Sequence, residues 1–249
     1  MDHTHYRLTE AGRKAWEDQD TAIPEVYRQL LWVIGFQGDA RAIANILREH
    51  PEHLLTAWLG ELQELRLIER LTEPPAHDPD RTIPLEEAEL GKKAAGALFR
   101  TGAYLAAQRP AATSKCKSPE ETIVMIVEDD PDQLALADLR VSMAGYRVRV
   151  ASSIDGLLRS LLTDGIPDVL LLDVMLPDGD GFEVLAKMRR HRKFVSLPIV
   201  MLTIKSDPQD IGKGLTLGAN GYVTKPYTKD VLVDVIRRVL GDENHRMGT

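Results

Sequence analysis

The chain has 249 residues, of which 43% are hydrophobic and 28% charged, and its formal net charge is −7. This length suits one large domain or two small ones, and the composition is that of a soluble globular protein. The sequence has no apolar run long enough to cross a membrane and no leader-like segment at Met1, so we expect no membrane partner. Its single cysteine, Cys116, excludes an intramolecular disulfide and a cysteine-built metal site, and we expect a cytoplasmic location.

The first half of the chain, residues 1–112, is predicted to be a small, mainly helical domain. Residues 6–13 indicate a strand followed by a helix, and apolar positions in 43–47 and 54–65 recur at helical spacing on either side of a proline break. Residues 67–71 then indicate another strand. This order of helix, turn, helix and strand resembles a winged-helix domain, and we expect the first strand to pair with the last.

The charge of this half argues against DNA binding. Residues 1–112 contain 13 Lys and Arg against 18 Asp and Glu, whereas contacts with DNA phosphates require Lys or Arg. The predicted helix at 51–65, in the position of a recognition helix, has Glu52, Glu61 and Glu64 and no basic residue. We therefore predict that this half contacts protein or a second copy of the chain, with DNA binding as the alternative.

A joint between the two halves follows from composition. Residues 86–108, rich in glycine and alanine, are predicted to form one further helix, which either accepts another helix at close range or packs within the N-terminal core. The stretch after it has two prolines and no hydrophobic period, which is typical of a linker. We place the linker at 113–121, a second domain at 122–241 and a flexible tail at 242–249.

The second half of the chain alternates strand and helix five times. Its predicted strands are short apolar runs, and several of its predicted helices begin at a capping residue and end at a glycine. The strands cover 123–127, 147–151, 168–172, 198–202 and 221–223, and the helices cover 131–144, 152–162, 181–190, 207–217 and 228–240. This (βα)5 order predicts an α/β fold with a doubly wound parallel sheet of the flavodoxin type.

Polar residues follow four of these strands. Glu128 and Asp129 come after the first strand, Asp173 after the third, Thr203 after the fourth and Lys225 after the fifth. The carboxyl ends of the strands form the edge at which open α/β sheets bind ligands. Carboxylates gathered there raise one another's pKa, and a bound divalent cation relieves the repulsion. Oxygen ligands favour Mg²⁺ over zinc, and a carboxylate beside Mg²⁺, a hydroxyl and an ammonium group is suited to accept a phosphoryl group.

The residues at this edge occur in an order and at spacings known from one family: Glu128-Asp129, Asp173 with the turn at Met175–Gly181, Thr203, Tyr222 and Lys225-Pro226. The region from about residue 122 to residue 240 therefore resembles the CheY-like receiver domain of two-component response regulators. The resemblance implies that Asp173 is the phosphoacceptor, that Thr203 hydrogen-bonds the phosphoryl group and that Lys225 pairs with it. It further implies a cis peptide at Lys225-Pro226 and a Tyr222 ring that turns inward when Thr203 moves. The alternative for Tyr222 is an ordinary aromatic residue of a strand.

The resemblance also implies a Mg²⁺ site. Asp129 and Asp173 would bind the ion directly, and Glu128 would act largely through water. The backbone carbonyl of Met175 would complete the ligands that the protein supplies.

Four neighbouring residues need separate interpretation. Asp130 is predicted to cap the helix that follows it, and Asp178 and Asp180 are predicted to serve the turn after the third strand. Ile204 departs from the family, which usually has a small residue after the position of Thr203. A branched side chain there would slow access to the phosphoryl pocket. This departure leaves open a receiver that phosphorylates poorly, or a scaffold that signals without phosphate.

The sequence therefore predicts a response regulator of a two-component phosphorelay with its receiver domain last. A sensor histidine kinase or phosphotransfer protein would donate a phosphoryl group to Asp173. Phosphorylation would move Thr203 and Tyr222 and repack the surface near the fourth and fifth helices and the fifth strand of the receiver. The N-terminal half would then bind a downstream protein or a second copy, and the alternative is a phosphorylation-controlled DNA-binding transcriptional regulator. We expect no enzymatic activity beyond autocatalytic transfer to Asp173.

Overall fold

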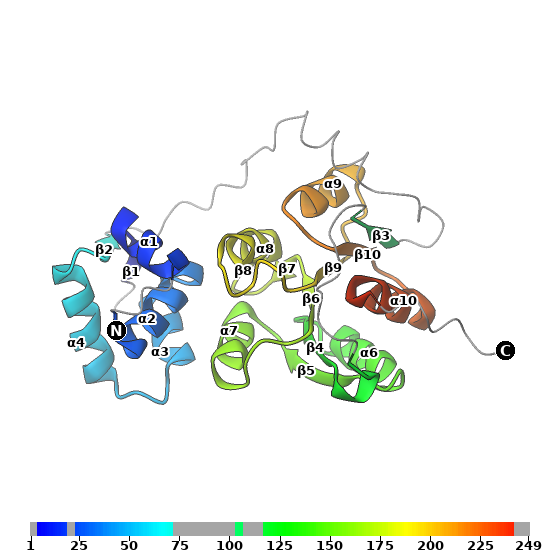
Figure 1. Ribbon diagram of the computed structural model, residues 1–249, viewed down its shortest axis with the longest axis horizontal. Helices are drawn as coiled ribbons and strands as arrows, with labels where there is room; N and C mark the ends of the chain where they lie inside the picture. The colour runs from blue at the N-terminus through cyan, green and yellow to red at the C-terminus, as the bar shows by residue number, and fades with distance from the viewer. Residues whose placement is uncertain (1–3, 19–22, 72–102, 107–116, 242–249) are drawn as a thin grey trace.

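The computed structural model describes residues 4–18, 23–71, 103–106 and 117–241. They form two units that lie against each other: helices from the first 71 residues, and an α/β unit built on one large sheet (Figure 1). None of the helices in these described ranges has the length and apolar character needed to span a membrane.

The sheet has six strands in the order β3-β10-β9-β6-β4-β5. Five of them pair in parallel: β4 (Ile123–Val127), β5 (Arg147–Ala151), β6 (Val169–Asp173), β9 (Ile199–Thr203) and β10 (Gly221–Thr224). Every residue of β6 and β9 is buried, as expected for central strands covered on both faces. The predicted (βα)5 order and parallel pairing are confirmed.

Helices cover both faces of this sheet. The apolar sides of α7, α8 and α9 belong to one core, and those of α6 and α10 belong to the core on the other face. Their bounds are α6 (Pro131–Ser142), α7 (Ile154–Thr163), α8 (Gly181–Arg190), α9 (Pro208–Thr216) and α10 (Lys229–Leu240). A short 3-10 turn, η1 (Pro119–Glu121), precedes β4, within the segment predicted as a linker.

Local capping explains where two of these helices begin. The carboxylate of Asp130 accepts hydrogen bonds from the backbone N–H groups of Asp132 and Gln133 at the start of α6, which confirms its predicted role as an N-cap. Asp180 accepts from the N–H of Phe182 in the same way at the start of α8. Asp180 closes a hairpin of two short strands, β7 (Met175–Leu176) and β8 (Gly179–Asp180), that directly follows β6.

The sixth strand corrects the prediction for the joint. Residues Ala103–Leu105 form β3, which pairs antiparallel with β10 at the edge of the sheet. The helix predicted at 86–108 is therefore wrong over these three residues, and they extend the sheet of the second unit although the prediction assigned them to the first. Residues 86–102 of that predicted helix, the segment 107–116 and the predicted tail at 242–249 lie outside the described residues.

The N-terminal unit is a group of helices with a two-stranded ribbon. Its helices are α1 (Glu10–Asp18), α2 (Glu25–Phe36), α3 (Ala40–Ile46) and α4 (Glu52–Glu64), and its strands are β1 (His5–Leu8) and β2 (Ile68–Leu71). The predicted pairing of the first strand with the last is confirmed: β1 pairs with β2 along its whole length, and the structure shows the pairing to be antiparallel. The sequence analysis missed α2, whose segment Leu30–Ile34 is buried throughout.

The two units meet through α2 and α3 on one side and α7 and α8 on the other (Figure 1). Aromatic rings form part of this contact. Trp16 lies edge-on to His191 with ring centroids 5.1 Å apart, and Phe194 contacts both Trp32 and Phe36, at 6.1 Å and 6.4 Å. The N-terminal unit therefore lies against the second and third helices of the α/β unit.

Candidate functional site

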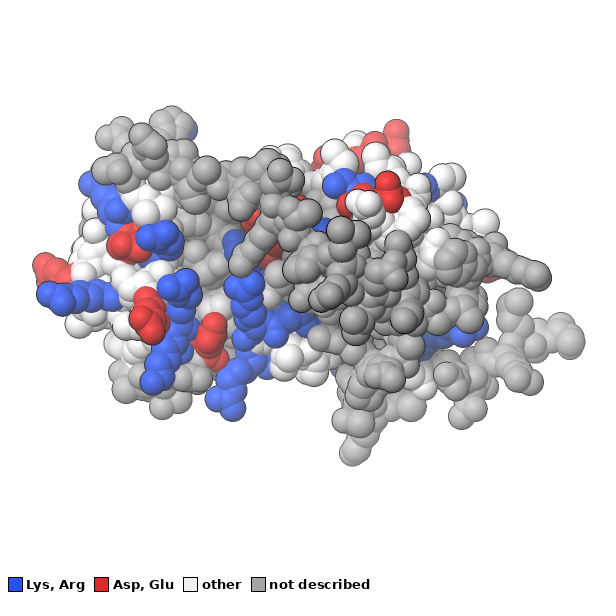
Figure 2. Space-filling view, turned by 90° about the horizontal axis from the view of Figure 1, so that it is seen from above, with Lys and Arg blue, Asp and Glu red and all other residues white. Residues whose placement is uncertain are grey.

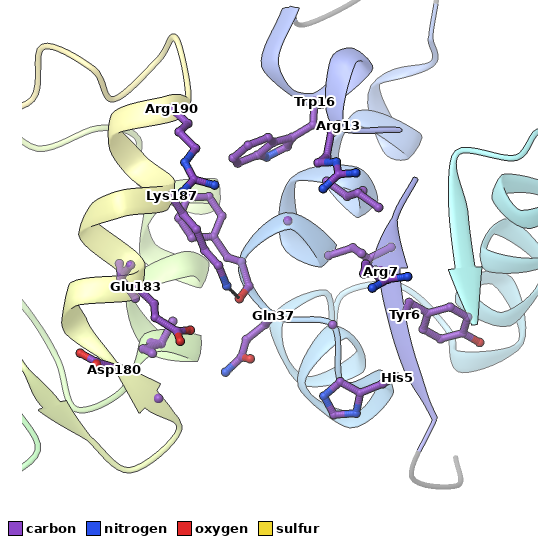
Figure 3. Close-up of a pocket in the computed structure, with 18 of the residues that line it drawn as sticks. His5, Tyr6, Arg7, Arg13, Trp16, Gln37, Asp180, Glu183, Lys187 and Arg190 are labelled. Atoms are coloured by element: carbon purple, nitrogen blue, oxygen red, sulfur yellow. Dashed lines mark hydrogen bonds between the residues drawn. The ribbon is translucent and has the colours of Figure 1, made fainter. Parts of the chain in front are cut away.

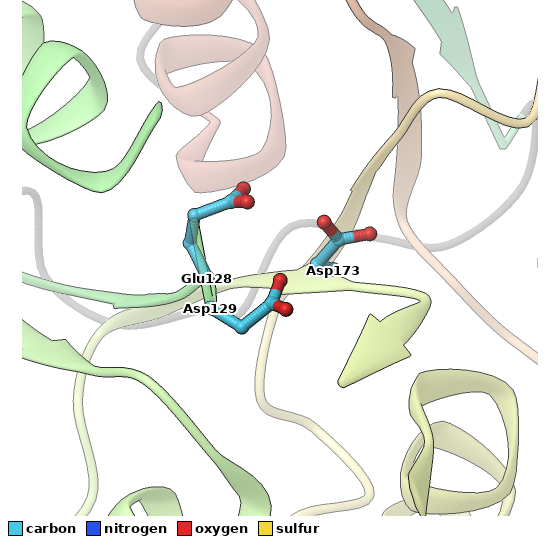
Figure 4. Close-up of side chains that lie close together, drawn as sticks. All are labelled: Glu128, Asp129 and Asp173. Atoms are coloured by element: carbon cyan, nitrogen blue, oxygen red, sulfur yellow. The ribbon is translucent and has the colours of Figure 1, made fainter. Parts of the chain in front are cut away.

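Three carboxylates lie together at the carboxyl edge of the parallel sheet. Glu128 and Asp129 directly follow β4, and Asp173 is the last residue of β6, the strand next to β4 (Figure 4). Each offers a carboxylate oxygen within 4.8 Å of the oxygens of the other two. Glu128 and Asp173 are only 2% and 6% exposed, whereas Asp129 is exposed to solvent. The predicted convergence of these residues is thus present in the structure.

Lys225 places a positive charge between two of these carboxylates. Its ammonium group donates to Asp173 Oδ2 at 2.7 Å and to Glu128 Oε2. Burial alone lowers the pKa of Lys225, but the hydrogen bonds from its ammonium to Asp173 and Glu128 outweigh burial and raise it. Burial also raises the pKa of Glu128, and the bond from Lys225 offsets only part of this increase. The predicted cis peptide at Lys225-Pro226 is confirmed, and it follows directly after β10.

Both carboxylate oxygens of Asp173 have partners. While Oδ2 binds Lys225, Oδ1 accepts from the backbone N–H groups of Val174 at 2.5 Å and Met175 at 3.2 Å. The backbone of Asp173 is also closely packed, because a Cβ at Gly181 would lie 2.1 Å from its carbonyl oxygen. The start of α8 therefore presses directly against the end of β6, and the side chain of Asp173 is oriented toward the edge of the sheet.

Thr203 lies on β9, the strand next to β6, and Tyr222 lies on β10, between β9 and β3. The hydroxyl of Thr203, at the end of β9, accepts from the backbone N–H of Lys205 at 3.1 Å. The ring of Tyr222 is fully buried, its hydroxyl donates to the carbonyl of Lys205 at 2.9 Å, and burial raises its pKa. Tyr222 and Thr203 thus share Lys205 as a hydrogen-bond partner, so the inward position of the ring is tied to the segment that carries Thr203. Ile204 is 67% exposed.

The donor set suits a hard divalent cation. In the described part of the chain, the cluster of side chains able to bind a metal consists of the carboxylates of Glu128, Asp129 and Asp173. Carboxylate oxygens are the ligands that Mg²⁺ prefers, and this ion keeps several waters, so a partly exposed site such as that of Asp129 is compatible with it. Lys225 pairs with two of the carboxylates, and a cation bound beside Asp129 would offset the remaining negative charge.

Some contacts around this site are not indicated by any pattern in the sequence. Asp178, predicted to serve a turn, also accepts from the N–H groups of Ile154 and Asp155 at 2.9 Å each, and so caps the start of α7. Gln37, from the N-terminal unit, donates to the carbonyl oxygen of Asp178 at 3.0 Å. A local pattern can identify Asp178 as a turn residue, but it carries no signal for a partner more than 100 residues away.

Comparison with known proteins agrees with this geometry. The family model described as the response regulator receiver domain matches residues 124–237. The transcriptional regulatory protein AfsQ1 of Streptomyces coelicolor is 43% identical over 118 residues, which cover 47% of this chain and 50% of that protein. The DNA-binding dual master transcriptional regulator RpaA of Synechocystis sp. is 36% identical over 118 residues, covering 47% of this chain and 48% of that protein.

Among solved structures, the chemotaxis response regulator CheY4 of Vibrio cholerae is 28% identical with a TM-score of 0.45, and the match covers 48% of this chain and 98% of that one. The chain spans about half the length of the curated relatives it matches. The resemblance drawn from the sequence is confirmed for this region: residues 124–237 form a receiver domain of the response regulator family.

Proposed function

We propose that the chain is a response regulator of a two-component phosphorelay, in which Asp173 accepts a phosphoryl group from a histidine kinase or phosphotransfer protein. The observation that carries this proposal is the convergence of Asp173 with Glu128, Asp129 and the Lys225 ammonium at the carboxyl edge of the sheet. Mg²⁺ would be bound by Glu128, Asp129 and Asp173, with the backbone carbonyl of Met175 as a further ligand. When bound, the ion neutralises charge on the phosphoryl oxygens.

Asp173, Lys225 and Thr203 would each have a separate role in the transfer of the phosphoryl group. A carboxylate oxygen of Asp173 attacks the phosphorus of the phosphohistidine, a P–O bond forms, and the P–N bond breaks with its electron pair going to the imidazole of the donor. Lys225, whose ammonium already bonds Asp173 Oδ2, balances the charge of the transferred group. The Thr203 hydroxyl donates to one phosphoryl oxygen. The chain turns over no other substrate, so it is a phosphoacceptor rather than an enzyme with a separate reaction.

The simplest test is phosphorylation by a small-molecule donor such as acetyl phosphate in the presence of Mg²⁺. We expect the wild-type protein to gain one phosphoryl group, measured by intact mass, and Asp173→Asn to gain none. Asp234→Asn, a matched change in an ion pair on the surface of α10, should be labelled as the wild type is. Labelling of Asp173→Asn at the wild-type level would contradict the assignment.

The output of the N-terminal unit is proposed to be a protein contact. Helix α4 has no Lys or Arg, and Glu52, Glu61 and Glu64 on it are all exposed. On the face shown in Figure 2, Lys and Arg over this unit are interspersed with Asp and Glu. Such a surface gives DNA phosphates few unopposed positive charges. We also propose a cytoplasmic location, in accord with the single cysteine of the chain.

The second candidate is a DNA-binding transcriptional regulator, which the similarity to the transcriptional regulatory protein AfsQ1 and the DNA-binding transcriptional regulator RpaA favours. One measurement distinguishes the two candidate functions: titration of the protein with DNA at moderate salt, before and after treatment with beryllofluoride and Mg²⁺. Salt-sensitive binding that responds to beryllofluoride would support the regulator. A change in oligomeric state without DNA binding would support the protein contact.

A further inference from the structure

The β7–β8 hairpin joins Asp173 to the rest of the molecule. The hairpin begins two residues after Asp173, and Met175, its first residue, donates its N–H to Asp173 Oδ1 at 3.2 Å. At its other end the N–H of Gly181 donates to the carbonyl of Val174 at 2.8 Å, which closes the hairpin against the end of β6. A change in what Asp173 Oδ1 bonds must therefore change the backbone that starts this hairpin.

The tip of the same hairpin contacts the N-terminal unit. The carboxylate of Asp178 caps α7 within the receiver, while the backbone carbonyl of Asp178 accepts from the side-chain amide of Gln37 at 3.0 Å. Figure 3 shows Gln37 extending from the N-terminal unit toward the receiver. Gln37 directly follows α2, so its side chain links the end of that helix to the hairpin.

A second polar contact fixes the same end of α2. The ammonium of Lys187, on α8, donates to the backbone carbonyl of Phe36, the last residue of α2, at 2.8 Å. The last carbonyls of a helix lack partners within the helix and carry partial negative charge, so a lysine is well placed there. Lys187 and Gln37 therefore hold the end of α2 against α8 and the hairpin together.

The contact between the units is not fully packed. A pocket of about 350 Å³, open to solvent on one side, lies between them, lined by residues such as Trp16 and Gln37 of the N-terminal unit and Asp180 and Lys187 of the receiver (Figure 3). Close-packed cores resist small displacements, whereas residues that line an open pocket have fewer neighbouring atoms to displace. Beside this pocket the hairpin and the end of α2 therefore have room to shift against each other, while the apolar side chains of α2 belong to the same buried cluster as those of α7 and α8.

We propose that the β7–β8 hairpin couples the occupancy of Asp173 to the docking of the N-terminal unit on α7 and α8, with Gln37 as the positioning residue. The inference rests on the proposed function, because it requires a phosphoryl group or its analogue on Asp173. In the arrangement seen here, Gln37 restrains the hairpin while Asp173 Oδ1 bonds the N–H groups of Val174 and Met175. An added group at Asp173 competes for these donors and moves the hairpin, which weakens the Gln37 contact. By linkage, weakening the Gln37 contact favours the added group to the same extent.

The three tryptophans of the chain make this coupling measurable without a label. All of them, Trp16, Trp32 and Trp58, lie in the N-terminal unit, and the first two contact His191 and Phe194 of the receiver. Tryptophan emission therefore reports on the N-terminal unit, whereas beryllofluoride binds on Asp173. We expect emission to change when beryllofluoride and Mg²⁺ are added to the full chain, and to stay constant in Asp173→Asn. The response should persist in Trp58→Phe and decrease in Trp16→Phe.

The reciprocal test measures beryllofluoride affinity by ¹⁹F NMR titration. Gln37→Glu keeps the shape of the side chain but removes its N–H donor to the Asp178 carbonyl and places a second carboxylate beside Asp155, with which Gln37 also interacts. Both changes weaken the contact, and we expect beryllofluoride to bind at least about two- to tenfold more tightly, the range for loss of one hydrogen bond. Gln63→Glu on α4 is the matched control and should bind as the wild type does. Lys187→Met removes the second contact and should shift the affinity in the same direction, which keeps the test valid if Gln37→Glu folds poorly.

The outcomes separate the inference from the proposed function. Wild-type protein that does not bind beryllofluoride would overturn the proposed function. A different result would overturn the coupling alone. In that result the wild-type protein binds beryllofluoride but its tryptophan emission does not respond, and Gln37→Glu and Lys187→Met both leave the beryllofluoride affinity unchanged or weaken it.

Discussion

Gly181 shows how one residue sets the geometry of the phosphoacceptor site. It stands where α8 begins, and a Cβ there would lie 2.1 Å from the carbonyl oxygen of Asp173 and 2.9 Å from the Cα of Val174. Both neighbours are backbone atoms of a buried strand end, so neither can move aside without moving the site itself. The close approach of α8 to β6 thus requires glycine at this position.

We expect Gly181→Ala to lower the free energy of unfolding by about 1–3 kcal/mol, the usual cost of overpacking, and to reduce phosphorylation of Asp173. Urea denaturation and labelling with acetyl phosphate measure the two effects. Gly60→Ala is the control, and we expect it to change the free energy of unfolding in the opposite direction. Gly60 lies in the interior of α4, and nothing lies within 4 Å of a Cβ at this position. That variant should be about 0.5–1 kcal/mol more stable than the wild type. Equal effects from both substitutions would contradict this account.

The position of Tyr222 depends on a second glycine. A Cβ at Gly214, on α9, would lie 2.9 Å from Cδ2 and 3.1 Å from Cε2 of the Tyr222 ring. We expect Gly214→Ala to displace the ring from its buried position, because the ring is the side chain nearest to the added methyl group. Faster nitration of Tyr222, located by peptide mass mapping, would show the displacement, and protection equal to that of the wild type would argue against it.

At the scale of elements, the receiver strands could be predicted closely because their apolar runs and turn residues are local signals. The strand predicted at 123–127 matches β4, and the helix predicted at 181–190 matches α8. Helix α2 was missed because Leu30–Ile34 is a continuous apolar run without helical period, and such a run is buried on all sides. Strand β3 was missed because its conformation comes from pairing with β10, and no local pattern records a distant partner.

The attachment of β3 can be tested through Ala103, which is buried against β10. An aspartate there would bury a charge, which costs several kcal/mol, more than a strand of three residues can supply. We expect Ala103→Asp to detach β3, so that amide hydrogen exchange of Tyr222 and Val223 becomes faster. Ala135→Asp, at an exposed position of α6, is the matched control and should leave this exchange unchanged.

At the scale of the whole molecule, the contact between the two units could not be predicted from the sequence. From the sequence we predict a phosphorylation-dependent change at the fourth and fifth helices and fifth strand of the receiver, and this stays a prediction; the contact of the N-terminal unit with α7 and α8 is a separate surface that no local pattern indicates. The residues that join the units, such as Gln37 and Lys187, are ordinary polar residues in their own segments. Only the folded arrangement brings them together, and the same holds for the aromatic contacts of His191.

His191 makes this contact sensitive to acid. Burial, and then the charge of Lys193, lower its pKa from 6.5 to about 4, so His191 is neutral in the folded protein. At a pH between the pKa of His191 in the unfolded chain, about 6.5, and its pKa in the folded protein, about 4, the unfolded chain binds more protons than the folded one. The free energy of unfolding therefore decreases as the pH falls through this range. The stability lost over this pH range is at most on the order of 3 kcal/mol. Urea denaturation at pH 7 and pH 5 should show the decrease, and His191→Phe should reduce it. Exposed His53→Phe should keep the wild-type dependence.

The pairing of β3 with β10 also determines which fragment limits should give a monomeric receiver domain. The region matched by the family model, residues 124–237, excludes β3. A fragment with those limits would present the bare edge of β10, and an unpaired strand edge is a template for aggregation. At the opposite edge, β5 carries Arg147 and Arg149, charges of the kind that discourage such pairing. An expression fragment that starts before residue 103 should therefore stay monodisperse at concentrations where one that starts at residue 118 self-associates, which size-exclusion chromatography can compare directly.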